Sequence, residues 1–340
     1  MKQKTGVLLV NLGTPDSTAV SDVRKYLREF LMDERVIDIP FLGRWLLVNM
    51  IIAPFRSPKS AKEYRKLWED RGSPLKFYGE DVTETLQQKL GDSYAVELGM
   101  RYQNPSIEKA LVALKKQDIS EIIVIPLFPQ YASATTGSVI QRVNEIVNTW
   151  QTIPAITYIN KFFEHPDFIN SFKENALKMM NESEYDHIIF SYHGLPERQI
   201  HKGSNNGYCQ LSDKCCSNYG PKNELCYRAQ CFTTSKLLAE AIGIEKEKYT
   251  TTFQSRLGKD PWIQPYTDDF LKTLPAKGIK KVLAFSPAFI SDCLETTVEV
   301  GETFKEDFIE AGGEVWDLVP SLNNNESWVN CLASLVLPNN

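Results

Sequence analysis

A short apolar run, Ile188 to Phe190, restricts the possible folds of this chain more than any other segment. The run has no polar alternation, which is typical of a strand buried on both faces, as in a parallel sheet flanked by helices. It leads to His193, followed by Gly194 and Pro196. Because open α/β sheets bind ligands at the carboxyl ends of their strands, the run predicts an imidazole at a ligand-binding edge. The alternative interpretation is a histidine that only bonds to its own loop.

The same pattern recurs along the chain, where strand-like runs alternate with segments that carry apolar residues every three or four positions. The predicted strands cover residues 6–12, 95–100, 121–126 and 153–158, then 188–191, 249–254, 280–286 and 314–318. Alternating strands and helices indicate an α/β fold. We therefore predict two Rossmann-like, doubly wound parallel-sheet halves, residues 1–160 and 161–340, that face a central cleft.

The charge distribution gives no sign of a nucleic-acid-binding protein. The net charge is −5, and no run rich in lysine or arginine occurs among the 340 residues. The turn after the first predicted strand, Gly13 to Pro15, lacks the spaced glycines of a dinucleotide-binding loop, so NAD is not expected. The amino-terminal residues lead directly into that strand and leave no room for a signal peptide, which predicts a cytoplasmic protein.

The most apolar segment of the chain runs from Phe41 to Phe55. It is interrupted by Arg44, Asn49 and Pro54, and it is too short to span a bilayer. Three interpretations are open: a core helix, the apolar lip of a cleft, and a segment at a membrane interface. We predict that this segment forms a cleft lip.

Four carboxylates follow the strand predicted at residues 280–286: Asp292, Glu295, Glu299 and Glu302. Their spacing of three and four residues places them along one face of a helix. An exposed face is one interpretation, because like charges at this spacing repel only weakly in water. The other is functional, since the row begins at the carboxyl end of a strand, as the histidine does. A histidine that faces carboxylates can hold a divalent metal ion or pass protons between groups.

Five of the seven cysteines lie between Cys209 and Cys231, within a polar insert that covers residues 202–231. Four thiolates can hold zinc or a 2Fe–2S cluster. The paired Cys-x-x-Cys spacing of zinc sites is absent, which favours iron–sulfur, and reduced bystander thiols are the third interpretation. Neighbouring thiolates on an extended backbone point apart, so a single site is expected to use only one of an adjacent pair. The predicted ligands are Cys209, Cys226, Cys231 and one of Cys215 or Cys216, with Cys216 preferred.

Several longer motifs follow one another along nearly the whole chain. They are Asn11–Pro15, Gly72–Pro74, Pro129–Gly137, Ser191–Pro196, Thr252–Arg256 with Pro261–Trp262, and Asp292–Thr296. Together they resemble the ferrochelatase family. The resemblance implies a lyase that inserts Fe²⁺ into a porphyrin to give haem, the terminal step of haem biosynthesis. It also implies loose association with a membrane through the lips of the cleft.

The resemblance implies roles for individual residues as well. His193 and Glu295 are implied as the paired active-site residues that meet the Fe²⁺ substrate, with Asp292 and Glu299 on an acidic path behind the glutamate. The implied pocket-lining residues are Leu12, Tyr102, Tyr131 and Trp262. These roles agree with the chemistry, because insertion removes the pyrrole protons and therefore needs a base at the ring and a route for charge to leave.

Two features depart from the simplest members of that family. The segment from Lys202 to Leu225 resembles the internal cluster region of a bacterial subgroup with 2Fe–2S centres. Thr303 replaces the last glutamate of the acidic helix, and Glu302 is expected to take its place on the path. Relatives that resemble coproporphyrin enzymes carry a tyrosine where this chain has Leu12, which predicts protoporphyrin IX as the substrate.

Two other functions stay open at this point. One is a chelatase for another metal or tetrapyrrole, although a more carboxylated ring calls for more arginine and lysine than the apolar lip offers. The other is a two-lobed haem- or porphyrin-binding protein that uses an iron–sulfur cluster as a sensor and inserts no metal. Together with the membrane association that the ferrochelatase resemblance implies, the expected location is the cytoplasm, with a peripheral position on the inner face of the cell membrane.

Overall fold

The computed structural model describes residues 4–204, 206–258 and 260–337, which form two compact units. Within these ranges unit 1 takes residues 4–128, 133–160 and 329–337, and unit 2 takes residues 129–132 and 161–328. The ends of the predicted halves, residues 1–3 and 338–340, and Asn205 of the predicted insert lie outside the described residues. The division of the lip and the active site between residues 1–160 and 161–340 stays a prediction.

Unit 1 is built on a four-stranded parallel sheet in the order β2-β1-β3-β4. Its strands are β1 (Lys4–Gly13), β2 (Tyr94–Tyr102), β3 (Ile119–Pro126) and β4 (Ala155–Tyr158). β1 pairs with β2 as far as Gly13 and Tyr102. Gly13 has a φ of +115°, and a Cβ there would lie 2.0 Å from the carbonyl oxygen of Tyr102. Only glycine lets these two strand ends approach so closely.

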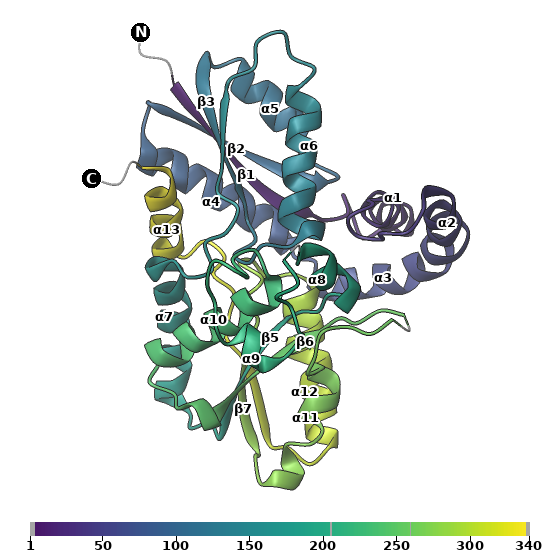
Figure 1. Cartoon of the computed structure of the whole chain (residues 1–340), viewed down its shortest axis with the longest axis vertical. Coiled ribbons are helices and arrows are strands. Elements are labelled where there is room, and N and C mark those ends of the chain that lie inside the picture. The colour runs from purple at the N-terminus through teal and green to yellow at the C-terminus, as the bar shows by residue number, and fades with distance from the viewer. Residues whose placement is uncertain (1–3, 205, 259, 338–340) are drawn as a thin grey trace. The chain divides into compact units, whose positions relative to one another are not determined.

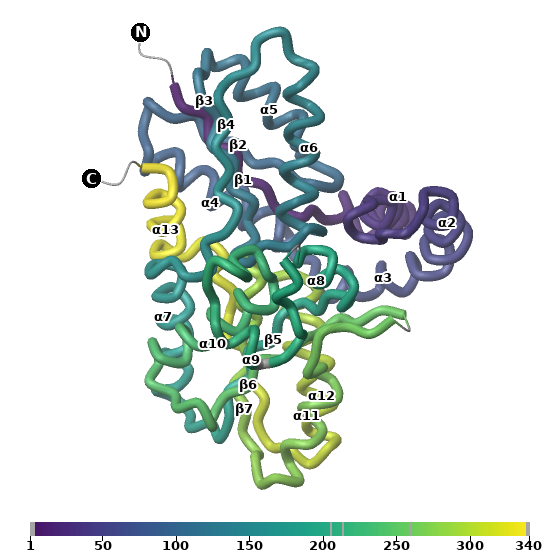
Figure 2. The backbone as a smooth tube through the Cα atoms, in the orientation of Figure 1, coloured from purple at the N-terminus to yellow at the C-terminus, as the bar shows by residue number. Residues whose placement is uncertain are grey.

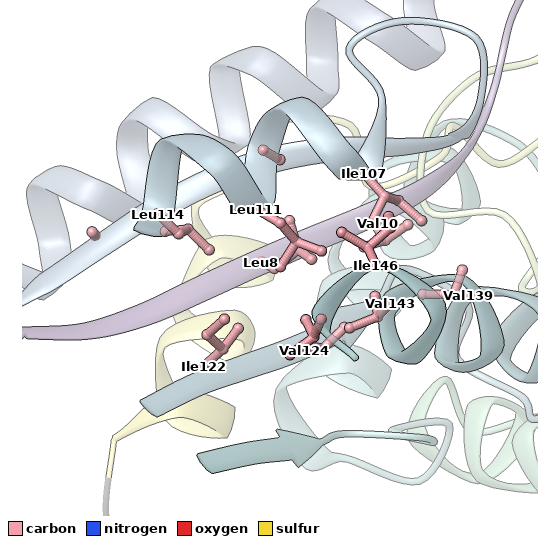
Figure 3. Close-up of a cluster of buried hydrophobic side chains, with 13 residues drawn as sticks. Leu8, Val10, Ile107, Leu111, Leu114, Ile122, Val124, Val139, Val143 and Ile146 are labelled. Atoms are coloured by element: carbon pink, nitrogen blue, oxygen red, sulfur yellow. The ribbon is translucent and has the colours of Figure 1, made fainter. Parts of the chain in front are cut away.

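Helices cover both faces of this sheet (Figure 1): α4 (Pro74–Leu90), α5 (Ile107–Lys115) and α6 (Ser138–Val147), the last preceded by a π-helix, η2 (Ser133–Gly137). α5 and α6 pack on one face, where their apolar side chains meet those of β1, β2 and β3 (Figure 3). α4 lies on the other face, because Gly79 packs against Leu98, which points away from Ala95 of the first face. Burial on both faces explains the apolar runs in the two middle strands, Val7–Val10 of β1 and Ile122–Ile125 of β3.

A group of helices leaves the sheet between β1 and β2, and Figures 1 and 2 show it in purple and dark blue. It comprises α1 (Val20–Leu31), α2 (Phe41–Leu46), the π-helix η1 (Leu47–Ile52) and α3 (Ala53–Leu67). Large apolar side chains of the predicted lip are exposed: Phe41, Leu42, Trp45, Leu46, Met50, Ile51 and Phe55. Leu42 is 68% and Phe55 80% exposed, so the core-helix interpretation is wrong.

A buried arginine explains why the apolar side of α2 faces outward. The Nη1 of Arg44 donates hydrogen bonds to the carbonyl oxygens of Ile37 and Ile39, at 3.1 Å and 3.0 Å. Its guanidinium therefore anchors the inner side of the helix and leaves the apolar residues on the other side exposed. Over the described part of the chain, every helix is too short or too polar to cross a bilayer.

Unit 2 repeats the topology with a second parallel sheet, in the order β6-β5-β7-β8. Its strands are β5 (His187–His193), β6 (Tyr249–Gln254), β7 (Lys281–Phe285) and β8 (Val315–Leu318). β6 follows β5 to its last residue, where His193 pairs with Gln254, whereas the pairing with β7 stops at Phe190 and Phe285. The chain order reverses between β5 and β7, and open sheets bind ligands at such a point.

The helices of unit 2 show toward which face of the sheet the His193 side chain points. They are α7 (Pro166–Glu182), α8 (Glu197–Gly203), α9 (Asp213–Cys216), α10 (Tyr227–Ala241), α11 (Thr267–Leu271), the π-helix η5 (Leu294–Thr303) and α12 (Phe304–Glu310). Short 3-10 turns lie at η3 (Lys246–Lys248) and η4 (Pro275–Lys277), and both units share α13 (Glu326–Val336). Ile189 packs against residues of α11, η5 and α12, whereas the hydroxyl of Tyr192 lies 3.0 Å from Ser235 of α10. Strand alternation therefore turns the His193 side chain toward η5.

The predicted α/β fold with two parallel sheets is confirmed, and each predicted strand overlaps an observed one. The carboxylate row was predicted from α-helical spacing, and that geometry is wrong, because residues 294–303 form the π-helix η5 ahead of α12. The wider turn of a π-helix advances each residue by a smaller angle. The row of carboxylates therefore does not follow an α-helical face, and Glu302 is exposed whereas Glu299 is half-buried.

Candidate active site

His193 is the last residue of β5 and is half-buried. Its Nδ1 lies 2.7 Å from the carbonyl oxygen of Gly194. A carbonyl only accepts hydrogen bonds, so Nδ1 carries the ring proton, and in the neutral imidazole Nε2 holds the free lone pair. The backbone therefore selects the tautomer whose Nε2 can take up a proton or bind a metal ion.

The residue after the histidine brings two further segments close to it. The N–H of Gly194 donates to the carbonyl oxygen of Gln254 at 2.8 Å. A Cβ on Gly194 would lie 2.9 Å from that oxygen and 3.1 Å from the ring of Trp262, so the close approach requires glycine. The ring centroids of His193 and Trp262 are 6.4 Å apart. The structure thus brings these two predicted site residues together.

Glu299 of η5 belongs to the same network. Its Oε2 accepts a hydrogen bond from Gln254 Nε2 at 3.0 Å and another from the hydroxyl of Ser255. Burial raises the pKa of the Glu299 carboxyl above its ordinary value, and the charge of Glu295 adds to this. The hydrogen bond from Ser255 and the charge of His193 act in the opposite direction without cancelling the effect of burial. Glu299 therefore interacts electrostatically with both His193 and Glu295.

The side chain of Gln254 connects the end of β6 to β5 and to the start of η5. Its Nε2 also donates to the backbone carbonyl of Glu295 at 2.8 Å, and its Oε1 accepts a hydrogen bond from Ser191 at 2.7 Å. The Ser191 hydroxyl in turn lies 2.9 Å from that of Thr267. Gln254 thus fixes the start of η5 relative to the strand that carries His193.

The other two predicted carboxylates lie at the ends of η5. Asp292 is held by Asn323, whose Nδ2 donates to Oδ2 at 2.8 Å and whose Oδ1 accepts the Asp292 N–H at 2.9 Å. Glu302 lies at the other end and is exposed. The structure therefore brings Glu299 close to both His193 and Glu295, whereas Asp292 precedes η5 and Glu302 lies near its other end. Their joint role as a path stays a prediction.

The predicted pocket-lining residues differ in exposure. In unit 2, Tyr131 is half-buried and its N–H donates to Oε1 of Gln230 at 2.6 Å. In unit 1, Leu12 is half-buried near the end of β1. Tyr102 is fully buried at the end of β2, and its hydroxyl donates to Oδ2 of Asp33 at 2.9 Å. Their contact with a substrate stays a prediction.

Asp33 collects hydrogen bonds at this edge of the unit 1 sheet. Its Oδ2 accepts from Nη2 of Arg101 at 2.6 Å and from the hydroxyls of Ser138 and Tyr102. Burial raises the pKa of the Asp33 carboxyl, but hydrogen bonds from Ser138 and the Arg35 backbone and the charge of Arg101 outweigh burial, so the pKa is lowered. An ionised carboxylate therefore holds Arg101 and Tyr102 in place.

The five clustered cysteines are free thiols that interact with one another. The sulfur atoms of Cys215 and Cys216 are 3.7 Å apart, and Cys226 interacts electrostatically with Cys209, Cys215, Cys216 and Cys231. Burial raises the pKa of Cys216 to about 12 and also raises the pKa values of Cys226 and Cys231. These three side chains are therefore neutral thiols, and the five clustered cysteines together supply enough sulfur donors for a four-thiolate centre.

Geometry alone does not assign a metal to these thiols. Within residues 4–204, 206–258 and 260–337, no group of three or more His, Cys, Asp or Glu side chains is placed to hold a metal ion. A four-thiolate centre would need the cysteine side chains to reorient around it. The cluster therefore stays a prediction that rests on the donor set.

The sequence interpretation gave no role to the residues that make the hydrogen bonds described above, Gln254 and Ser255 in unit 2 and Asp33 and Arg101 in unit 1. Gln254 ends a predicted strand and Ser255 follows it, at the same sheet edge as His193, and that position was a usable signal. The contacts of Asp33 with Arg101 depend on the packing of α1 beside β2, for which the sequence offers no signal.

Solved structures show which fold this chain shares. SirB from Bacillus subtilis with Fe³⁺ matches with a TM-score of 0.55 at 12% identity, over 98% of this chain and 94% of that one. The sirohydrochlorin chelatase SirB from Bacillus subtilis subspecies spizizenii, in complex with cobalt, matches with a TM-score of 0.50 at 11% identity, over 98% and 93%. At these identities the likeness shows the fold, which is the two-unit α/β fold of chelatases.

Sequence comparison narrows this class to one family. The ferrochelatase family model matches residues 4–340. The ferrochelatase of Legionella pneumophila (strain Lens) is 44% identical over 333 residues, 98% of each chain. That of Coxiella burnetii (strain Dugway 5J108-111) is 46% identical over 336 residues, 98% of this chain and 93% of the relative. The chain belongs to the ferrochelatase family, lyases that insert Fe²⁺ into a porphyrin in haem synthesis. The family implied by the motifs is confirmed.

Proposed function

We propose that this chain is a protoporphyrin ferrochelatase, which inserts Fe²⁺ into protoporphyrin IX and gives protohaem. The observation that carries the proposal is the tautomer of His193, whose free Nε2 stands in one electrostatic network with the buried carboxyl of Glu299. A proton acceptor and an acidic group behind it are the two elements that removal of pyrrole protons requires.

Insertion exchanges the two N–H bonds of the porphyrin for bonds between nitrogen and Fe²⁺, so two protons must leave. His193 accepts a pyrrole proton at Nε2, and Glu295 and Glu299 take it onward. A carboxyl with a raised pKa suits this step, because it holds a proton at a pH where an ordinary glutamate is ionised. His193 and Glu295 also meet the Fe²⁺ substrate before insertion, since imidazole nitrogen and carboxylate oxygen are ligands that this metal accepts. The single lone pair at Nε2 takes up a proton only after the metal ion has left it for the porphyrin nitrogens.

The acidic path continues outward from Glu299 in this proposal. Gln254 and Ser255 hold its carboxyl in place by hydrogen bonds. Glu302 stands at the exposed end of η5 and releases the proton to solvent, in the role that the missing glutamate at Thr303 has in relatives. Asp292 lies ahead of η5 and serves the other end of the path.

Of the four residues implied as porphyrin-binding, Leu12, Tyr131 and Trp262 are half-buried and are assigned direct contacts with the ring. Tyr102 is fully buried and is assigned a supporting role behind them. A porphyrin is a flat, largely apolar ring, which calls for apolar and aromatic contacts with a few polar groups at the edge. Trp262 supports this assignment most directly, because its ring lies beside the imidazole of His193. Leu12 offers methyl groups and no hydroxyl, which supports a ring that carries vinyl groups.

Steady-state insertion with two porphyrins tests the proposed substrate. We expect kcat/KM for protoporphyrin IX to exceed that for coproporphyrin by at least about tenfold, because burying extra propionates against an apolar side chain is unfavourable. Leu12→Tyr is the matched variant and should bring the kcat/KM values for the two porphyrins closer together. A higher kcat/KM for coproporphyrin would contradict the assignment, and tight binding of either porphyrin without insertion would favour the sensor function.

We also propose that the clustered cysteines hold one 2Fe–2S cluster through Cys209, Cys216, Cys226 and Cys231. Support comes from their mutual electrostatic interaction and from the polar composition of the insert, which leaves it little apolar surface of its own. When bound, such a centre supplies metal–thiolate bonds that order a segment lacking a core. The thiols themselves anchor the insert to the start of α10.

Metal and sulfide analysis after purification without air tests the cluster. We expect two iron atoms and two acid-labile sulfides per chain, as the cluster formula requires. Cys226→Ser should lose this iron, and Cys331→Ser should keep it, because Cys331 is buried in α13, outside the insert. One zinc per chain without sulfide would instead mean a structural zinc site. A protein without metal and without sulfide would mean that the cysteines are bystander thiols.

We propose further that residues 41–55 bind the surface of a membrane and that the protein is cytoplasmic and peripheral. Their exposed apolar side chains are followed on α3 by Arg56, Lys59 and Lys62. An exposed apolar segment next to cations is typical of proteins that lie on anionic lipid surfaces. The same segment serves as the lip of the porphyrin cleft.

Vesicle flotation tests the lip. We expect the chain to float with vesicles of phosphatidylcholine and phosphatidylserine, and the double variant Leu42→Asp and Phe55→Asp to lose most of this binding. Ile153→Asp is the control, because Ile153 is an exposed apolar residue of the same unit outside the lip. Equal binding by all three proteins would contradict a membrane role of residues 41–55.

A further inference from the structure

Tyr227, the first residue of α10, makes a direct hydrogen bond to the residue at the centre of the site. Its side chain is 7% exposed, and its hydroxyl donates to the backbone carbonyl oxygen of His193 at 2.8 Å. The same hydroxyl also forms a hydrogen bond with the thiol of Cys231. A buried tyrosine hydroxyl is usually paired, but here its partner is the backbone of a proposed catalytic residue.

This bond replaces a missing sheet bond. The pairing of β5 with β7 stops at Phe190, so the last part of β5 lacks a neighbouring strand on that side. The peptide that joins His193 to Gly194 is held at both of its polar atoms. Tyr227 binds its carbonyl oxygen, and the carbonyl of Gln254 binds its N–H at 2.8 Å. Two fixed points define the orientation of a peptide plane, and with it the direction of the His193 side chain.

The next residue of α10 holds the segment around Trp262. The Nη2 of Arg228 donates to the carbonyl oxygen of Gln264 at 3.0 Å, and its guanidinium lies over the ring of Phe232, 4.5 Å from the centroid. The first turn of α10 therefore contacts both segments that carry site residues, and it does so directly after Cys226.

We propose that Tyr227 is a positioning residue for metal insertion, which orients the imidazole of His193 by fixing the peptide that follows it. The inference rests on the proposed role of His193. Tyr227 touches neither iron nor porphyrin in this assignment. Its loss should impair proton removal and leave the binding of the porphyrin as it is, because the porphyrin contacts come from other residues.

Tyr227→Phe tests the proposal, because it removes the hydroxyl and keeps the ring. We expect kcat to fall at least about tenfold, with KM for the porphyrin and its binding by fluorescence changed less than about twofold, since misplacement of a catalytic group lowers rate more than affinity. Hydrogen exchange should show faster exchange of the Gly194 amide. Tyr192→Phe is the matched control, because its buried hydroxyl also joins β5 to α10 but bonds to Ser235.

An equal loss of kcat in Tyr227→Phe and Tyr192→Phe would contradict the proposal, because it would mean that only the packing of α10 against β5 matters. Full activity of a folded Tyr227→Phe protein would also overturn it. If Tyr227→Phe does not fold, 3-fluorotyrosine at position 227 keeps the shape and strengthens the donor. An unchanged exchange rate of the Gly194 amide in that protein would also overturn it. His193→Ala tests the proposed function separately. If the His193→Ala protein is active, both the proposed function and the role of Tyr227 lose their basis. If His193→Ala is inactive but Tyr227→Phe is fully active, only the role of Tyr227 is rejected.

Discussion

Replacing His193 with alanine should abolish iron insertion and leave porphyrin binding intact. The substitution removes the Nε2 lone pair that accepts a pyrrole proton, while the assigned porphyrin contacts remain. General acid–base groups contribute about a hundredfold to ten-thousandfold, and we expect a loss toward the upper end because the same imidazole also meets the metal. Insertion under anaerobic conditions and porphyrin fluorescence measure the two properties separately.

His187→Gln serves as the control for this variant. His187 lies at the opposite end of β5, and its Nε2 is 2.9 Å from the hydroxyl of Thr250. Burial lowers the pKa of His187 to about 4, so this imidazole is neutral at physiological pH. A glutamine can keep the hydrogen bond, and kcat should therefore stay near that of the parent. Full insertion activity of His193→Ala would contradict the assignment of His193 as the group that accepts a pyrrole proton.

Glu299→Gln should lower kcat by about a hundredfold and at the same time make the folded chain more stable at neutral pH. The loss of rate follows from removing a proton-carrying group behind His193. Glutamine keeps an acceptor for the hydrogen bonds from Gln254 and Ser255, so the geometry of η5 should persist. The gain in stability follows from removing a charge that burial disfavours.

The sign of the pH dependence follows from linkage. Glu299 has an ordinary pKa of 4.5 in the unfolded chain and a higher one in the folded chain. Between these two values the folded chain binds more protons, so its stability falls as pH rises through that window. The variant lacks this fall. Thermal unfolding should therefore show a higher midpoint for Glu299→Gln near neutral pH and a smaller difference as pH approaches 4.5.

Glu302→Gln is the matched control on the same helix. Glu302 is exposed, so its substitution should change kcat only severalfold and should leave the pH dependence of unfolding unchanged. A loss of kcat as large as that of Glu299→Gln would place Glu302 on the inner part of the path. If Glu299→Gln and the parent protein have the same unfolding midpoint at every pH, the raised pKa of Glu299 is contradicted.

The sequence allowed the sheets and the position of His193 to be predicted, because both depend on local patterns. Residues such as Ile188 to Phe190 read as a doubly buried strand wherever they occur, and the polar residue that ends the strand must then stand at the sheet edge. The topology that brings Gln254 beside His193 also follows from right-handed strand–helix–strand connections. These parts of the fold need no knowledge of distant contacts.

The contacts that set the chemistry could not be predicted in the same way. The tautomer of His193 depends on the turn at Gly194, and the bond from Tyr227 depends on how α10 packs, which no local pattern encodes. The exposure of the lip was open for a related reason. Apolar composition does not distinguish a buried helix from an exposed one, and the buried guanidinium of Arg44 decided which side of α2 faced outward.

The π-helix η5 makes the length of its segment as important as its composition. A π-helical stretch accommodates a residue that an α-helix of the same rise would exclude, so deleting one residue between Glu295 and Glu299 would let the stretch relax to an α-helix. That change would rotate every position after the deletion and would carry Glu299 away from Gln254. In lineages that retain this chemistry, positions of the segment other than Glu295 and Glu299 should therefore tolerate substitutions, whereas the segment as a whole should resist single-residue insertions and deletions. Surface loops, by contrast, are free to vary in length.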